Sequence, residues 1–204
     1  MNLSSFTNRS SPPETIMALG GISWERFHQI ESSFDGVDSI KLTYLTGELE
    51  IMSPVGEEHE YVKSTIGTLL EAFMRKAGIR FYRRGGFTLK KKGYASGEPD
   101  ESYCIGTNKK VPDVVIEVIF TSGSVDKLEV YKPQKIPEVW FWKANQLQVF
   151  HLTEGKYEPV SRSQFFPDLD LEMLLHYINY PDQYDAVLAF QAALRDENSV
   201  SSQS

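Results

Sequence analysis

Hydrophobic positions recur at helical spacing in several stretches of the chain. The strongest pattern covers 57–77, where apolar residues return every three or four positions and Gly78 follows, a residue type common just beyond helix C-termini. Ser23 is a predicted N-cap for a helix that runs to Phe34. Two carboxyl-terminal helices are predicted at 171–178 and 182–195.

Short runs rich in β-branched and aromatic residues predict strands between these helices. The run 113–120 is apolar at both its odd and its even positions, which predicts a central strand buried on both faces. Its connection to the next strand, at 138–142, is long enough for a parallel crossover with a short helix starting at Asp126. Other strands are predicted at 40–45, 49–52, 79–83, 87–91, 99–105 and 147–152.

Turn residues indicate how these strands connect. Thr46-Gly47 predicts a hairpin near the start of the chain. Gly85-Gly86 predicts a direct connection between two later strands, and 93–97 reads as a loop. The strand at 147–152 is expected to pair back at the sheet edge, with His151 on its solvent face.

The element order is helix, strand, strand, strand, helix, strand, flanked by an N-terminal hairpin and C-terminal helices. It predicts an α/β protein (α+β, with a mixed sheet) whose helices cover the sheet faces. The length of 204 residues suits one domain, which we place at 15–197. The polar ends, 1–14 and 198–204, are predicted to be disordered.

Composition is ordinary for a globular protein, with 41% hydrophobic and 24% charged residues. The single cysteine, Cys104, excludes an intramolecular disulfide and fits a reducing compartment. No apolar stretch reaches membrane-spanning length, and the N-terminus lacks the apolar core of a signal peptide. These features predict a cytoplasmic protein.

Glu117 interrupts the central apolar strand with a carboxylate. A buried charge needs a cation, a metal ion or a raised pKa, because burying it unpaired costs several kcal/mol. It is therefore either a structurally paired glutamate, or one at the strand rim, or a site residue. Asp100 lies upstream after a loop, and Lys127 follows in the next predicted helix, whose N-terminus lies near the strand's end. Two carboxylates can bind a divalent cation, and a lysine can orient water or stabilise charge on phosphate.

His59 points to the core side near the N-terminus of the strongest helix. A hydrogen-bonded core histidine is the simpler interpretation, and a residue that orients a site side chain is the alternative.

A basic run without any acid lies between Met74 and Gly93, although the formal net charge of the chain is −7. Such a run suits phosphate binding, and the alternative is a solvated face with acids opposite it. The candidate phosphate contacts are Arg83, Arg84, Lys90 and Lys91.

Three stretches together resemble the PD-(D/E)XK nuclease superfamily, and more narrowly the bacterial Uma-two family of restriction-endonuclease-like proteins. They are Gly47-Glu48-Leu49-Glu50-Ile51-Met52-Ser53-Pro54 with His59 shortly after, then Pro99-Asp100, and Pro112-Asp113-Val114-Val115-Ile116-Glu117-Val118 running on to Asp126-Lys127 and Pro137-Glu138-Val139-Trp140. The resemblance covers about Trp24 to Leu152 and implies a restriction-endonuclease-like α-β-β-β-α-β core. It also implies that Asp100 and Glu117 bind Mg²⁺ or Mn²⁺.

The sequence departs from the superfamily at one point, because Ile119 stands where a lysine is expected. The resemblance implies that Lys127 fills this role from the following helix. Two partial copies of the motif are discounted. Pro112-Asp113 lies on the same strand as Glu117 with no hairpin between, and Glu154-Gly155-Lys156 has the pattern of an exposed turn.

The leading hypothesis is a metal-dependent endonuclease that hydrolyses DNA phosphodiester bonds, with Asp100, Glu117 and Lys127 as catalytic residues. RNA stays open as a substrate, and a homodimer is compatible with double-strand cleavage. The alternative is a non-enzymatic nucleic-acid-binding or scaffold protein with a decayed nuclease site, which the isoleucine at 119 favours.

Overall fold

A computed structural model describes residues 15–37, 40–53 and 56–201. Most predicted helices form close to their expected bounds, and Ser23 caps the first of them by accepting a hydrogen bond from the Arg26 amide. The helices are α1 (Trp24–Ser33), α2 (Glu57–Lys76), α3 (Lys127–Tyr131), α4 (Leu171–Ile178) and α5 (Gln183–Ser201), and a 3-10 turn, η1 (Lys132–Gln134), extends α3.

A six-stranded mixed sheet holds the predicted central strand, β8 (Val114–Ile119). The strands lie in the order β11-β10-β9-β8-β7-β4, and β8 and β9 pair in parallel while the other neighbours are antiparallel. The parallel pair confirms the predicted crossover through α3. The other five strands are β4 (Phe81–Arg83), β7 (Glu101–Ile105), β9 (Glu138–Lys143), β10 (Gln146–Thr153) and β11 (Lys156–Val160).

A second, antiparallel sheet of five strands corrects the expectation of a single sheet. It contains β1 (Thr15–Leu19), β3 (Glu48–Ser53), β2 (Lys41–Leu45), β6 (Ala95–Gly97) and β5 (Leu89–Lys91), in that order. The expected direct connection of β4 to β5 is wrong, because β5 pairs instead with β6, in the segment predicted to be a loop. The chain crosses between the sheets at Gly86, where a Cβ would lie 2.9 Å from the Pro99 carbonyl oxygen, so a larger residue would not fit without a backbone shift.

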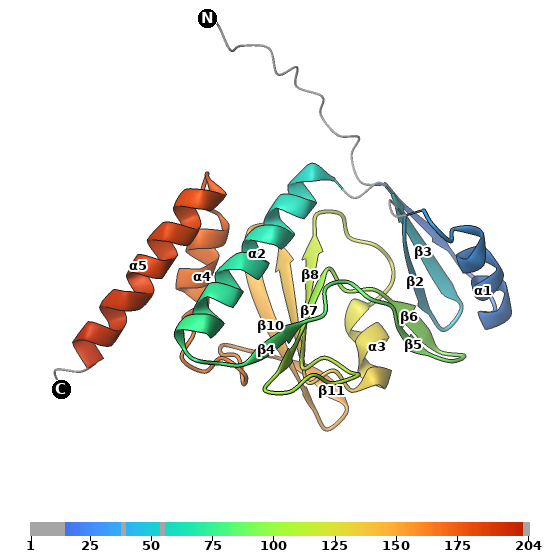
Figure 1. Ribbon diagram of the computed structural model, residues 1–204. Helices are drawn as coiled ribbons and strands as arrows, with labels where there is room; N and C mark the ends of the chain where they lie inside the picture. Colours follow the sequence, from blue (N-terminus) through green and yellow to red (C-terminus); the bar gives the residue numbers. More distant parts are fainter. Residues whose placement is uncertain (1–14, 38–39, 54–55, 202–204) are drawn as a thin grey trace, which may run out of the picture.

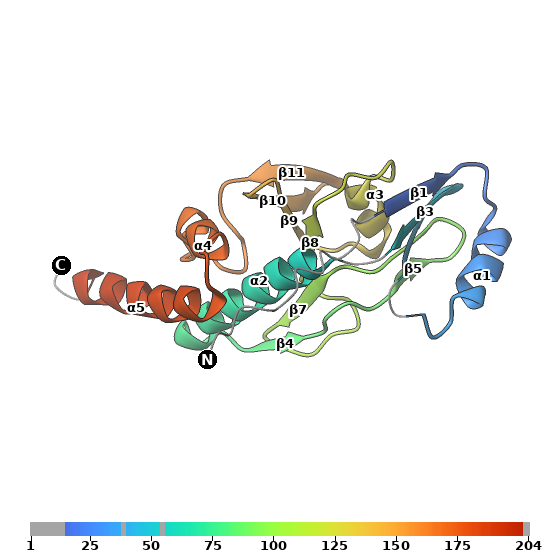
Figure 2. The ribbon, with the colours of Figure 1, turned by 90° about the horizontal axis from the view of Figure 1, so that it is seen from above.

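Helices α2, α4 and α5 pack together on one face of the six-stranded sheet, and α3 lies on the other (Figure 1). The view from above shows the five-stranded sheet beside α3, at the opposite end of the molecule from α5 (Figure 2). Strand β8 alternates between the two faces. Val114, Ile116 and Val118 join the core with α2, whereas Val115 packs in the core with α3 and Glu117 contacts α3 side chains.

Three more expectations are corrected. The strand β11 covers β10, so β10 is not the sheet edge. His151 does not face solvent, because its Nε2 lies 2.9 Å from Glu138 Oε2. The helix α5 continues to Ser201, past the predicted start of the tail, while 1–14 and 202–204 lie outside the described residues.

Candidate active site

Asp100 and Glu117 lie near each other at one end of the β7–β8 pair. The antiparallel register of β7 and β8 ends with Glu101 opposite Ile116, and Asp100 comes one residue before β7. The Asp100 amide donates a 3.1 Å hydrogen bond to the Ile116 carbonyl, and the Asp100 carboxylate accepts one from the Val118 amide, so Asp100 lies beside the stretch that holds Glu117. Both carboxylates are buried, at 4% relative exposure each. The fold therefore brings together the two acids that the sequence predicts as metal ligands.

Asp100 is surrounded by three donors or cations. Its Oδ2 accepts a 2.7 Å hydrogen bond from the Val118 amide and lies 3.2 Å from His59 Nε2, while its Oδ1 contacts the ammonium of Lys41. Burial opposes ionisation of this carboxyl, but the hydrogen bond with His59 and the charge of Lys41 outweigh it. Together they hold the pKa of Asp100 well below its usual range.

Glu117 has the opposite electrostatic balance. The Tyr131 hydroxyl donates to its Oε1, and Lys127 Nζ lies 3.8 Å from its Oε2. Burial raises the pKa of Glu117, and the negative charge of Asp100 adds to this rise despite the compensation from Lys127. Adjacent buried carboxyls whose pKa values move apart in this way are characteristic of functional sites.

Lys127 begins helix α3, and this start is fixed from two sides. The Asp126 carboxylate caps the helix by accepting from the Leu128 amide at 2.9 Å. Lys127 Nζ donates a 3.0 Å hydrogen bond to Thr43 Oγ1 on β2, which aims the ammonium at the space beside Glu117. The predicted reach of Lys127 back to the central strand is thus realised in the structure.

The loop before α3 is held by Glu50 of β3. Its Oε1 accepts a 2.7 Å hydrogen bond from the Val125 amide. The carboxylate sits so close to Gly123 that a Cβ on that residue would collide with it. The five-stranded sheet therefore fixes the segment that carries Lys127.

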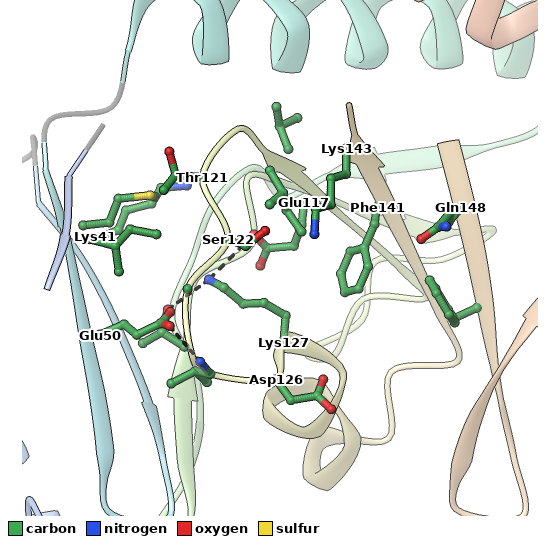
Figure 3. A pocket seen from close by; sticks show the side chains of 18 residues that line it. Lys41, Glu50, Glu117, Thr121, Ser122, Asp126, Lys127, Phe141, Lys143 and Gln148 are labelled. Atoms are coloured by element: carbon green, nitrogen blue, oxygen red, sulfur yellow. Dashed lines mark hydrogen bonds and ion pairs between the residues drawn. The ribbon is translucent and has the colours of Figure 1, made fainter. Parts of the chain in front are cut away.

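A pocket of about 310 Å³ opens between the two sheets at the end of β8. Figure 3 shows Lys127 extending from α3 toward Glu117, with Lys41 and Lys143 on other sides of the same space. Phe141, the cross-strand neighbour of Glu117, forms an apolar part of the wall. The side chains that line it from the two sheets and α3 include Lys41, Thr43, Glu50, Met52, Glu117, Lys127, Phe141, Lys143, Gln148 and Phe150.

The two carboxylates form a donor set that suits Mg²⁺, which is bound in proteins through one or two carboxylates and retains several waters. Within the described residues, no group of three or more His, Cys, Asp or Glu side chains is placed to hold a metal ion. Any cation here would therefore use Asp100 and Glu117 with water or backbone oxygens. Lys41 would have to leave Asp100 Oδ1 for this to happen.

His59 lies beside Asp100, so of the two interpretations the structure supports contact with a site side chain. The predicted phosphate contacts lie outside the pocket lining. Arg83 pairs with Glu101 at 2.5 Å, and Lys90 pairs with Glu31 at 2.8 Å. Arg84 donates to Asn108 Oδ1 and to the Lys109 carbonyl oxygen. Lys91 is exposed on β5.

Sequence reasoning missed Lys41 and Thr43 as site residues, and Lys143 as a side chain of the pocket. Lys41 and Thr43 alternate on one strand and point to the same side, but alternation also fits an ordinary solvent face. The packing of β2 beside β6, and of α3 against both strands, shows that this side of β2 faces the site and not solvent.

The sequence matches the Uma2 family, described as "Putative restriction endonuclease", over residues 24–181. The chain belongs to the Uma2 family. Membership in Uma2 agrees with the mixed α and β architecture of a restriction-endonuclease-like protein and supports a nuclease-like role. A comparison with curated proteins gives no match. In the part of the chain that is described, no helix combines the length and apolarity needed to cross a bilayer.

Proposed function

We propose that this Uma2 protein is a Mg²⁺-dependent endonuclease that hydrolyses DNA phosphodiester bonds. The observation that carries the proposal is the proximity of two buried acids and a lysine: the Asp100 carboxylate accepts from the amide next to Glu117, and Lys127 Nζ lies 3.8 Å from Glu117 at the pocket. Oppositely shifted acids, a lysine and an open pocket are the elements that phosphodiester hydrolysis needs.

Asp100 and Glu117 would hold the metal ion. The bound metal would polarise the scissile phosphate and lower the pKa of an attacking water. Lys127, oriented by Thr43, places a positive charge where it can orient that water or stabilise negative charge on the phosphate. Tyr131 fixes one oxygen of Glu117, which leaves the other directed to Lys127.

A non-enzymatic protein with a decayed site is the second candidate. Ile119 in place of the motif lysine favours it, as does the engagement of both Asp100 oxygens by side-chain or backbone partners. Such a protein would bind nucleic acid through the same pocket without a catalytic need for metal.

Nicking of supercoiled plasmid DNA tests the proposal. We expect nicking with Mg²⁺ or Mn²⁺ and none with EDTA. A parallel assay with labelled RNA determines whether the substrate extends beyond DNA. Metal-independent nucleic-acid binding without any nicking would support the decayed-site candidate instead.

A further inference from the structure

Lys41 separates Asp100 from the pocket. The Asp100 side chain is 1% exposed, and among the described residues it does not belong to the pocket lining. Lys41 does line the pocket, and its ammonium contacts Asp100 Oδ1. A cation that enters from the pocket therefore meets Lys41 before it reaches this oxygen.

The ammonium also takes the charge-balancing role of a metal ion. Lys41 is only 17% exposed at its side chain, and it experiences the negative charges of both Asp100 and Glu117. With Lys127, two lysines oppose two carboxylates, so these four side chains carry no net charge. A divalent ion added to this set would meet an already neutralised pair of acids.

We propose that Lys41 is the internal counter-cation of the site: its ammonium occupies the cation position beside Asp100 and Glu117 in the metal-free protein, and a divalent cation must displace it into the pocket. This inference rests on the proposed metal-dependent function. Displaced, Lys41 keeps its positive charge at the pocket wall, where it can contact a phosphate. Without metal, the Lys41 side chain therefore neutralises the two acids. When metal is bound, the same side chain becomes a contact for the substrate phosphate.

Titration calorimetry with Mg²⁺ alone tests the competition. Lys41→Met removes the charge and keeps an unbranched side chain, so Mg²⁺ should bind about tenfold more tightly or better. Lys41→Arg keeps the charge and should bind Mg²⁺ no more tightly than wild type. Lys143→Met is the matched control, since Lys143 lines the same pocket and has no ion pair within the described residues.

A second measurement needs no substitution. Amine acetylation of the wild-type protein, read by peptide mass spectrometry, should increase at Lys41 when Mg²⁺ saturates the site, because the ammonium leaves its buried partner. Acetylation at Lys143 should not change. This readout stays informative if Lys41→Met fails to fold.

The outcomes separate the two proposals. Unchanged or weaker Mg²⁺ binding in Lys41→Met would mean that Lys41 only supports Asp100, and this would overturn the counter-cation role alone. Unchanged acetylation at Lys41 in a protein that binds Mg²⁺ would overturn it as well. Mg²⁺ binding by none of the proteins would overturn the proposed metal-dependent function itself.

Discussion

The strands β7, β8 and β9 carry buried carboxylates at both ends, and the two ends differ in how those carboxylates are paired. At one end, Asp113 accepts from the Ile105 amide at 2.7 Å and pairs with Lys109 at 2.7 Å. At the other end, Asp100 contacts a lysine and accepts from the Val118 amide, next to a second carboxylate, Glu117. Both aspartates follow a proline, so the dipeptide alone does not distinguish them.

The glutamates of the two ends show the same contrast. Glu138, at the Asp113 end, is fully buried and accepts from Trp140 Nε1 at 2.6 Å, Ser163 Oγ at 2.7 Å and the Gln164 amide at 2.9 Å. Among the described residues, Glu117 accepts from one hydroxyl, that of Tyr131, and has a lysine at 3.8 Å. A structural carboxylate is saturated by fixed donors, whereas a site carboxylate keeps an oxygen directed to a pocket.

The largest difference is expected from the two aspartates. Asp100→Asn should reduce plasmid nicking by more than about 1,000-fold, because it removes a proposed metal ligand. Asp113→Asn should leave nicking close to wild type and lower the free energy of unfolding by about 1–2 kcal/mol, because it weakens a charged hydrogen bond. Nicking rates and urea unfolding of both variants check this. The reverse pattern would place the chemistry at Asp113.

The helix α3 provides the next comparison. Lys127→Met should lower nicking by about 100-fold, since charge stabilisation at a reacting phosphate contributes on that scale. Lys132→Met is the matched control, because Lys132 extends the same helix but pairs with Glu129 at 2.8 Å. Mg²⁺ binding should survive in both variants. Wild-type nicking by Lys127→Met would exclude Lys127 as the replacement for the motif lysine.

The proximity of Glu117 and Lys127 could be predicted from the sequence because their signals are local, whereas the role of Asp100 is implied only by the family resemblance. Glu117 interrupts an apolar strand, and Lys127 begins a helix just after it. Lys41 could not be found in this way, because it lies 59 residues before its partner Asp100 and on another sheet. The crossing between the sheets could not be predicted either: at Gly86 the chain passes close to the Pro99 carbonyl, but a Gly-Gly pair equally suits a turn.

Substitution of the two buried glutamates, Glu138 and Glu117, by glutamine is expected to change the free energy of unfolding in different directions. Glu138→Gln should lower the free energy of unfolding by about 3 kcal/mol, because it leaves donors facing an amide NH₂ in a fully buried site. In EDTA at neutral pH, Glu117→Gln should be at least as stable as wild type, because it removes a buried charge next to Asp100. Thermal unfolding of both variants, with and without Mg²⁺, measures this. Mg²⁺ should raise the melting temperature of wild type and have little effect on Glu117→Gln.

The pH dependence follows from the raised pKa of Glu117. The folded protein binds this proton more tightly than the unfolded chain, so Glu117 lowers stability as the pH rises from about 4.5 through its folded pKa. Wild type in EDTA should show this decrease, and Glu117→Gln should lack it. The low pKa of Asp100 acts oppositely, with loss of stability below about pH 3.8 in both proteins. If wild type and Glu117→Gln had the same pH profile of stability above pH 4.5, the pKa of Glu117 would not be raised in the folded protein.

The smallest expected effect concerns phosphate contacts at the two ends. Arg84 lies toward the Asp113 end, where its guanidinium already donates to Asn108 and Lys109 oxygens, whereas Lys143 lines the pocket at the Glu117 end. Each phosphate contact contributes about 0.9 to the slope of log affinity against log salt concentration for duplex DNA. Lys143→Ala should therefore reduce the slope by about one, measured by fluorescence anisotropy in EDTA to prevent cleavage. Arg84→Ala should change the slope less. A larger change for Arg84→Ala than for Lys143→Ala would show that the DNA backbone contacts the basic run between Met74 and Gly93.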